Sequence, residues 1–368
     1  MQIEIRNEDL LPLLQKVIGV VERRSTMPIL GHIHLAAGGG AIQITATDLE
    51  IEIEVYGRSA NTSDLNTILP ARKLTDISRA LPLDTLLRLR IHENRALISA
   101  GRSRFTLLTL GGANFPRMEI PEGVTRLQLP AQELRFLLDK TAFAMAHGDV
   151  RYYLNGLLFV IRPDELVAVA TDGHRMAKAR RPVSTGIAEA AQIILPGKTV
   201  QEMRRLAAAS EFADGVTFEI SDRSFAVSTD RLVVRSKIID GRYPDYARAI
   251  PAEANDIARV NREVLREALT RTAVLSTDKY KGVRFTFTRT MLTLQAQNPE
   301  LEVAEEELEY EYDGAEHTIG FNGSYVLDVL NVISDELVEI AIVDSETSTI
   351  WRGLGATDET FVIMPMRL

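Results

Sequence analysis

The chain contains no cysteine among its 368 residues, which excludes disulfide bridges, thiolate metal sites and cysteine nucleophiles. This absence is compatible with a reducing cytoplasm, where we expect the protein to be located. The N-terminal sequence lacks a basic segment followed by an apolar run, so it does not resemble a secretory signal peptide. No apolar run approaches the roughly 20 residues that span a bilayer, and we therefore expect no membrane partner.

Positive charge is also in the minority. The chain has 42 lysine and arginine residues against 51 aspartate and glutamate residues, for a net charge of −9. Taken alone, this balance argues against a simple electrostatic DNA-binding protein. Because domains usually contain about 100–200 residues, the length predicts two or three domains.

The sequence repeats itself three times. Three segments show a short strand followed by a helix with apolar residues three and four positions apart, which predicts one buried helix face. They are residues 3–17, 127–141 and 258–272. Aligning Leu10, Leu134 and Leu265 gives offsets of 124 and 131 residues.

The segments that follow also repeat. Thr47-Asp48 and Thr171-Asp172 are again 124 residues apart, and each ends a stretch of alternating apolar and polar residues. Such alternation predicts half-buried strands of an antiparallel sheet. A second strand-helix unit and further alternating segments complete each third. The alternative is that generic patterning matched by chance, but the common order and spacing favour a true repeat.

We therefore predict an α+β fold of three tandem domains, each with two helices packed on antiparallel sheets. The predicted domains are 1–121, 125–250 and 252–368, with boundaries in the loops around Pro121-Glu122-Gly123 and Pro251-Ala252. Free sheet edges recruit other strands, so head-to-tail packing of such domains leads either to a closed ring or to a filament.

The charge is distributed unevenly between helices and the rest of the chain. The predicted helices are residues 8–24, 72–80, 132–143, 198–209, 262–272 and 324–333. They contain 14 basic and 10 acidic residues, a net of +4, so the remainder carries −13. If all helices faced one hole, a positive lining would attract phosphates without contacting bases. The alternative is that arginine and lysine simply populate helix surfaces, since both favour helices.

An ordered set of short segments carries a family resemblance. The segments run from Met27-Pro28-Ile29-Leu30-Gly31 through Leu69-Pro70-Ala71-Arg72-Lys73, Asn114-Phe115-Pro116, Ala170-Thr171-Asp172-Gly173-His174-Arg175, Asp240-Gly241-Arg242-Tyr243-Pro244 and Ser324-Tyr325-Val326-Leu327-Asp328 to the terminal Met364-Pro365-Met366-Arg367-Leu368. With these segments the chain resembles the bacterial DNA polymerase III β subunit, the β sliding clamp, along essentially its whole length.

The resemblance implies a non-enzymatic processivity factor without a cofactor. A head-to-tail homodimer would close six domains around primed double-stranded DNA, independently of sequence. An ATP-driven clamp loader would load it. The ring would then tether the DNA polymerase III catalytic subunit and other proteins that carry a clamp-binding motif.

The resemblance also implies three sets of site residues. The partner-peptide site between the second and third domains would comprise Leu154, Thr171, Gly173, His174, Arg175, Met176, Pro244, Arg248, Asn322, Tyr325, Ser348, Val362, Met364, Pro365, Met366 and Arg367. The DNA-binding residues would be Arg24, Arg72, Lys73, Arg79, Arg151, Tyr152, Tyr153, Lys198, Arg204 and Arg205. The dimer interface would pair Arg95, Arg104, Phe105 and Leu107 with Val274, Leu275, Glu300 and Glu306.

Two of these sets, the peptide site and the DNA-binding residues, have a plainer interpretation. The Met-Pro-Met tail could fill a core, and one of the two adjacent tyrosines, Tyr152 and Tyr153, is expected to pack inward. Met-lined surfaces suit a site that accepts many sequences, while exposed aromatic rings suit stacking on single-stranded bases.

Signals for an enzyme are weak. Asp172-Gly173-His174 could belong to a hydrolase, but no partnered nucleophile is evident and a turn is the favoured interpretation. Gly197-Lys198-Thr199 resembles the end of a phosphate loop, yet Gln192 replaces the required earlier glycine. The six histidines show no metal-ligand spacing. A repeat-built scaffold that binds proteins but not DNA remains the alternative to the clamp.

Overall fold

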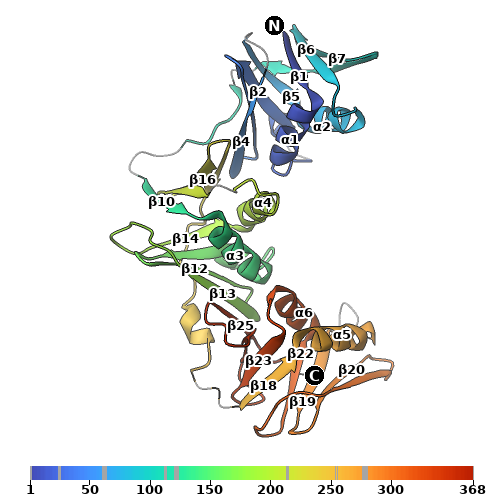
Figure 1. Cartoon of the computed structure of the whole chain (residues 1–368), viewed down its shortest axis with the longest axis vertical. Helices are drawn as coiled ribbons and strands as arrows, with labels where there is room; N and C mark the ends of the chain where they lie inside the picture. The colour runs from blue at the N-terminus through green and yellow to red at the C-terminus, as the bar shows by residue number, and fades with distance from the viewer. Residues whose placement is uncertain are drawn as a thin grey trace. The chain divides into compact units, whose positions relative to one another are not determined.

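The computed structural model describes residues 2–23, 26–59, 64–111, 114–119, 124–212, 215–252, 254, 256–275 and 281–367. Three times in succession the chain forms a strand, a helix, four strands, a second helix and three more strands (Figure 1). The predicted α+β fold with three tandem repeats is therefore confirmed.

The first domain contains helices α1 (Asn7–Val17) and α2 (Ala71–Ala80). Its strands are β1 (Gln2–Arg6), β2 (His32–Gly38), β3 (Ala41–Thr47), β4 (Ile51–Arg58), β5 (Leu65–Pro70), β6 (Leu86–His92), β7 (Arg95–Ala100), β8 (Ser103–Leu108) and β9 (Leu110–Gly111).

The second domain contains helices α3 (Ala131–Thr141) and α4 (Gly197–Ala208). Its strands are β10 (Thr125–Leu129), β11 (Gly156–Ile161), β12 (Glu165–Thr171), β13 (Arg175–Pro182), β14 (Ala191–Pro196), β15 (Val216–Ile220), β16 (Ser224–Thr229) and β17 (Leu232–Lys237).

The third domain contains helices α5 (Arg262–Thr272) and α6 (Gly323–Val332), which pack against each other (Figure 1). Its strands are β18 (Asp256–Asn261), β19 (Gly282–Phe287), β20 (Leu292–Gln297), β21 (Val303–Leu308), β22 (His317–Asn322), β23 (Leu337–Ile342), β24 (Thr349–Gly353) and β25 (Glu359–Ile363). No helix in the described part of the chain is long and apolar enough to cross a membrane.

The first helix is shorter than predicted. The predicted window 8–24 is wrong at its C-terminal end, because α1 stops at Val17 and the chain turns at residues 18–20. Gly19 in this turn lies close to α4, where a Cβ atom would approach Glu202 Oε1 to 2.2 Å. With the observed bounds the six helices carry 12 basic and nine acidic residues, which preserves a weak positive balance.

The chain folds as two compact units, Met1–Leu134 with Lys198–Ile238, and Arg135–Gly197 with Ile239–Leu368. In the first unit a nine-stranded sheet joins the first and second domains through β4 and β17. In the second unit an eight-stranded sheet joins the second and third domains through β13 and β25. At each junction, therefore, the third strand after one domain's first helix pairs with the last strand of the next domain.

Candidate peptide-binding site and nucleic-acid interface

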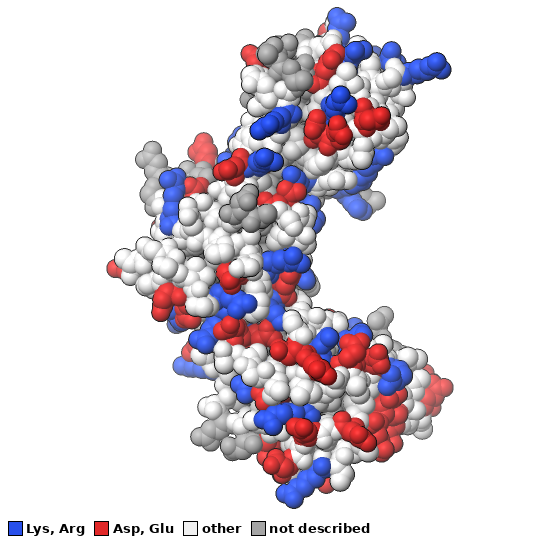
Figure 2. Space-filling view, viewed as in Figure 1, with Lys and Arg blue, Asp and Glu red and all other residues white. Residues whose placement is uncertain are grey.

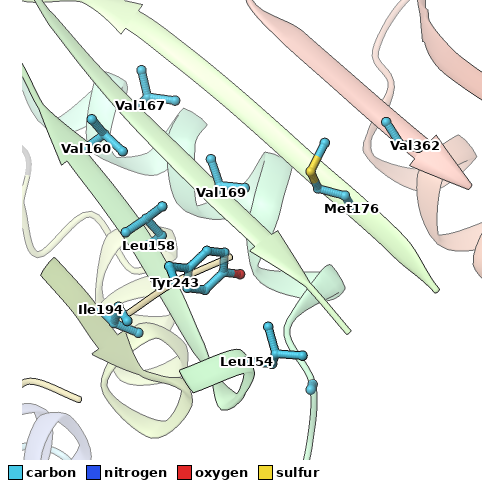
Figure 3. Packing of buried hydrophobic residues seen from close by; sticks show 10 residues of the cluster. Leu154, Leu158, Val160, Val167, Val169, Met176, Ile194, Tyr243 and Val362 are labelled. Atoms are coloured by element: carbon cyan, nitrogen blue, oxygen red, sulfur yellow. The ribbon is translucent and has the colours of Figure 1, made fainter. Parts of the chain in front are cut away.

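A buried apolar cluster in the second unit lies on the sheet where the second and third domains join (Figure 3). Its members are Ala146, Leu154, Leu158, Val160, Val167, Val169, Met176, Ile194, Tyr243 and Val362. Met176 on β13 lies beside Val362 on β25, because these two residues are partners in the antiparallel register. We call this set the junction cluster. It includes three residues predicted for the peptide site, Leu154, Met176 and Val362.

A tight turn between β12 and β13 borders the junction cluster. The Asp172 carboxylate accepts hydrogen bonds from the backbone N–H groups of His174 (2.9 Å) and Arg175 (3.0 Å). Gly173 has a φ of 88°, a left-handed conformation that favours glycine. Asp172 is thus committed to a turn, as the sequence predicted in preference to a catalytic pair. The His174 ring stacks on Tyr325 of α6, with 6.4 Å between ring centres.

Arg175 bridges this turn to the third domain. Its guanidinium donates to Asp172 Oδ2 (3.1 Å) and to the Phe143 carbonyl (2.9 Å), and it forms an ion pair with Asp328 of α6. Its charged carbon also lies 4.4 Å from the centre of the Tyr325 ring, within the range of a cation–π interaction. Arg175 therefore fixes α6 relative to the turn.

The C-terminal segment forms another border of the site. The Met364 N–H donates to the His174 carbonyl (2.9 Å), and the Met366 N–H donates to the Gly320 carbonyl (2.8 Å). The side chains of Met364 and Met366 are 48% and 37% exposed, so these methionines do not fill a core. Flexible thioethers at the surface can adapt to ligands of different shape.

The remaining predicted peptide-site residues have varied surroundings. Asn322 caps α6 by accepting from the Ser324 N–H at 3.0 Å. Pro244 and Arg248 are exposed, and Arg248 pairs with Asp245 at 3.0 Å. Ser348 is partly exposed, as are Pro365 and Thr171, while Arg367 is exposed. None of these residues belongs to the junction cluster as described.

The sequence analysis missed Tyr243, a central member of the junction cluster. Its hydroxyl accepts a hydrogen bond from the Thr171 N–H at 3.0 Å, and burial raises the pKa of this phenol. A signal was present in the repeat, since Tyr243-Pro244 corresponds to Phe115-Pro116 in the first domain. Sequence reasoning selected the proline and overlooked the buried aromatic residue before it.

The corresponding sheet face of the first unit has a different chemistry. The 124-residue offset places His34, Thr45 and Glu52 where the junction cluster has Leu158, Val169 and Met176. At the register position of Val362 stands Arg235, which pairs with the buried Glu52 at 2.9 Å.

The last segment of the first domain, residues 114–119, contacts this polar face. Arg117 lies 3.2 Å from Glu52 and also forms an ion pair with Glu54. Phe115 stacks on His34 with 5.5 Å between ring centres. Of these two corresponding sheet faces, only the one in the second unit is lined by apolar side chains.

Most residues predicted to bind DNA contact other parts of the chain. Arg24 lies outside the described residues. Lys73 is exposed and has no hydrogen bond or ion pair with any described residue. Arg72 donates to the Val21 carbonyl at 2.8 Å, and Arg79 lies 3.6 Å from Asp76.

The basic residues of α4 are held more firmly. Lys198 forms an ion pair with Asp48, whose side chain is only 6% exposed. Arg205 donates to the Gln15 and Lys16 carbonyls at the end of α1, at 3.2 and 2.6 Å. Arg204 is partly buried. Within the first unit Lys198 and Arg205 therefore connect α4 to the first domain.

One of the two adjacent tyrosines, Tyr152 and Tyr153, packs inward, as predicted. Tyr152 is 56% exposed, whereas Tyr153 packs against the junction cluster. Arg151 pairs with Asp149 at 2.8 Å and donates to the Asp172 carbonyl at 3.2 Å, which connects the tyrosine loop to the turn. The Arg151 hydrogen bond lowers the pKa of Asp149 to about 2. In the described part of the chain no group of three histidine or acidic residues could hold a metal ion.

Comparison with known proteins covers the whole chain. The models for the N-terminal, central and C-terminal domains of the DNA polymerase III beta subunit match residues 1–119, 128–245 and 247–367. The chain belongs to the DNA polymerase III β subunit family. It is 41% identical over 371 residues to the beta sliding clamp of Pseudomonas aeruginosa, with both chains fully covered.

Solved sliding clamps share the fold. The crystal structure of the DNA polymerase III subunit beta from Pseudomonas aeruginosa matches with a TM-score of 0.95 at 40% identity over all of both chains. A Pseudomonas aeruginosa sliding clamp bound to griselimycin matches with a TM-score of 0.95 at 41% identity, again over all of both chains. The resemblance read from the sequence is thus confirmed.

Family membership establishes the class of function. Sliding clamps are processivity factors of DNA replication and carry out no catalysis, so the predicted non-enzymatic role is confirmed. DNA and DNA polymerase are the partners of this family.

Proposed function

We propose that two copies of this chain close head-to-tail into a ring around primed duplex DNA, with domains at 1–121, 125–250 and 252–368 in each copy. The ring tethers the DNA polymerase III catalytic subunit and other clamp-binding proteins through the junction cluster, after loading by a clamp loader. Because its DNA partner is the bacterial chromosome, we place the protein in the cytoplasm.

The proposal of ring closure rests on two strand edges, those of β8 and β21, with which no described strand of the same chain is paired. Within the chain β4 pairs with β17 and β13 pairs with β25, each time joining equivalent strands of successive domains. The equivalent strands left over are β21 of the third domain and β8 of the first, and each lies at the edge of its four-stranded sheet. An unpaired edge is a template for another strand, so β21 of one copy would pair with β8 of the other.

The two edges are complementary in charge. β21 carries Glu305, Glu306 and Glu307, and Figure 2 shows acidic side chains gathered on the third domain near β20. The sheet that ends in β8 exposes Arg95 and Arg104. Within one chain Glu306 pairs with Arg271 at 2.8 Å, so the predicted contact of Glu306 with a partner arginine would compete with this bond.

Apolar side chains accompany both edges. Val274 is 78% exposed, Leu275 and Phe105 are partly exposed, and Leu107 is 8% exposed. Further exposed residues, Leu108 at 70% and Leu301 at 75%, extend these surfaces. Burial of such residues would supply most of the dimer's binding energy, while rim ion pairs would set the register.

Partner binding at the junction cluster is supported by its chemistry. It is a cluster of apolar side chains bordered by two exposed methionines, Met364 and Met366, and by the polar turn at Asp172. We propose that a short partner peptide binds there, and that griselimycin binds there as well. The corresponding face of the first unit is polar and charged. We therefore expect one partner-peptide site in each chain.

DNA contact is proposed for Lys73 and for Tyr152, which are exposed, together with the remaining predicted cations. A lining with few unpaired cations attracts phosphates weakly, which suits sliding.

The test is topological. The protein is loaded onto nicked circular DNA by a bacterial clamp loader, and the circle is then cut at high salt. Retention on the circle with release on cutting supports the ring. Equal loss from circular and linear DNA, with a working loader control, would mean ordinary electrostatic binding and would overturn the proposal.

A further inference from the structure

Lys140 is a buried cation on the last turn of α3 in the second domain. Its residue is only 7% exposed. The Lys140 ammonium donates to the Val332 carbonyl at 2.5 Å and to Ser334 Oγ at 3.3 Å, and it pairs with Glu359 Oε2 at 2.7 Å. An ammonium has three N–H donors, so all of them are used on third-domain acceptors.

Two of these acceptors, Val332 and Glu359, lie in third-domain elements that border the junction cluster, and Ser334 lies just after one of these elements. Glu359 is the first residue of β25, which continues to Val362 in the cluster. Val332 is the last residue of α6, whose first turns carry Tyr325 and Asp328. Lys140 therefore contacts the last residue of α6 and the first residue of β25, and both of these ends lie away from the predicted peptide site. Arg175 contacts the other end of α6, next to the site.

The ion pair with Lys140 stabilises the buried negative charge of Glu359. Its side chain is 5% exposed, and its Oε1 atom is buried without a hydrogen-bond partner among the described residues. Burial raises the pKa of Glu359, and the Lys140 ammonium opposes this effect. Lys140 is the cation that donates a hydrogen bond to Glu359. A buried charge that loses such a counter-ion is strongly destabilised, so removal of Lys140 should disturb the position of β25.

The same arrangement occurs at the other junction within the chain. Lys16 lies 124 residues before Lys140, also on the last turn of its domain's first helix. It pairs at 2.7 Å with Glu211, just after the second helix of the next domain. The repeated position shows that this cation connects successive domains, and it supplies a matched control outside the second unit.

We propose that Lys140 is a positioning residue of the partner-peptide site: it sets the placement of β25 and α6, and thereby the shape of the junction cluster, without contacting the ligand. This inference rests on the proposed peptide site. The coupling acts through two rigid elements whose far ends Lys140 holds, so its loss would alter ligand affinity at a distance.

The experiment measures griselimycin affinity by isothermal titration calorimetry on the full-length chain, together with the melting temperature. The variants are Lys140→Met, the double variant Lys140→Met with Glu359→Met, and the control Lys16→Met. The double variant removes both charges, so it leaves no unpaired buried ion and should recover thermal stability. We expect Lys140→Met and the double variant to bind about tenfold more weakly, and Lys16→Met to bind like the unmodified chain.

The affinity of the double variant decides the outcome. If it regains normal affinity along with its melting temperature, Lys140 acts only on stability and the inference is overturned. Normal affinity in Lys140→Met would overturn it as well. If Lys140→Met does not fold, the double variant alone carries the test. Absence of binding to the unmodified chain would instead refute the proposed peptide site, which keeps the two failures distinct.

Discussion

The Arg175 guanidinium lies over the ring of Tyr325, with 4.4 Å between its central carbon and the ring centre. The two residues come from different domains and belong to the same unit. Since Arg175 also pairs with Asp172 and Asp328, one side chain sets the distance between the β12–β13 turn and α6. This contact forms the polar border of the predicted peptide site.

Replacing Arg175 should therefore weaken ligand binding. We expect Arg175→Ala to lower griselimycin affinity at least about tenfold, because arginine is enriched among the residues that contribute most to binding and this one also holds α6 beside the site. Calorimetric titration measures the effect. Arg352→Ala removes a comparable ion pair with Glu339, at 3.0 Å, and serves as the control. An equal loss of affinity in both variants would contradict a specific role for Arg175.

Each chain should bind a single griselimycin molecule. The first-unit face that corresponds to the junction cluster carries the buried Glu52 and Glu54 with their arginine partners, and an apolar ligand cannot satisfy those charges. Titration calorimetry gives the stoichiometry directly. A second site of similar affinity would show that the polar face also accepts ligand.

Replacing Met176 should lower the stability of the fold, whereas replacing Met364 should lower ligand affinity. Met176 is 2% exposed, so Met176→Ala creates a cavity and should destabilise the second unit by about 2–5 kcal/mol. Met364 is 48% exposed, so Met364→Ala should change stability by less than about 0.5 kcal/mol while lowering griselimycin affinity. Urea denaturation and titration separate the two effects. A large stability loss in Met364→Ala would place that side chain in the core.

Lys73 should contribute more to DNA attraction than Lys198. Lys73 is exposed and makes no ion pair with a described residue, whereas Lys198 is paired with Asp48. Lys73→Ala should reduce the slope of log affinity against log salt concentration by about 1 on primed DNA, measured by fluorescence anisotropy. Lys237→Ala, which removes a cation already paired with Glu50 at 3.0 Å, is the control. An unchanged slope for Lys73→Ala would remove this residue from the DNA interface.

The Asp149–Arg151 pair should persist in acid. The hydrogen bond from Arg151 lowers the Asp149 pKa from 3.8 to about 2, so the folded state binds this proton more weakly than the unfolded state. The resulting stabilisation is complete above pH 3.8 and is lost as the pH falls toward 2. A carboxyl NMR titration should show the low pKa, and Arg151→Ala should return it toward 3.8. A titration unaffected by that substitution would exclude the pair as the cause.

Local patterns in the sequence were sufficient to predict the threefold repeat. Helices such as α5 and strands such as β12 follow from the spacing of their apolar residues, because each element must bury one face whatever its neighbours are. The 124-residue offset between Thr47-Asp48 and Thr171-Asp172 identified equivalent turns before any contact was known. The identity of the turn at Asp172 followed from its short polar residues and glycine, which act on their own backbone.

Contacts between distant segments decided the rest. Alternation predicted half-buried strands such as the one that contains Val169, but it could not show that Leu158, Val169 and Tyr243 would meet at one domain junction. Helix composition suggested that Lys198 and Arg205 were free to bind phosphate. Their partners, Asp48 and the end of α1, lie about 150 residues or more away in the chain and next to them only in the folded unit. Periodicity reports which face of an element is buried, whereas the partner of a charge is set by how separate elements pack.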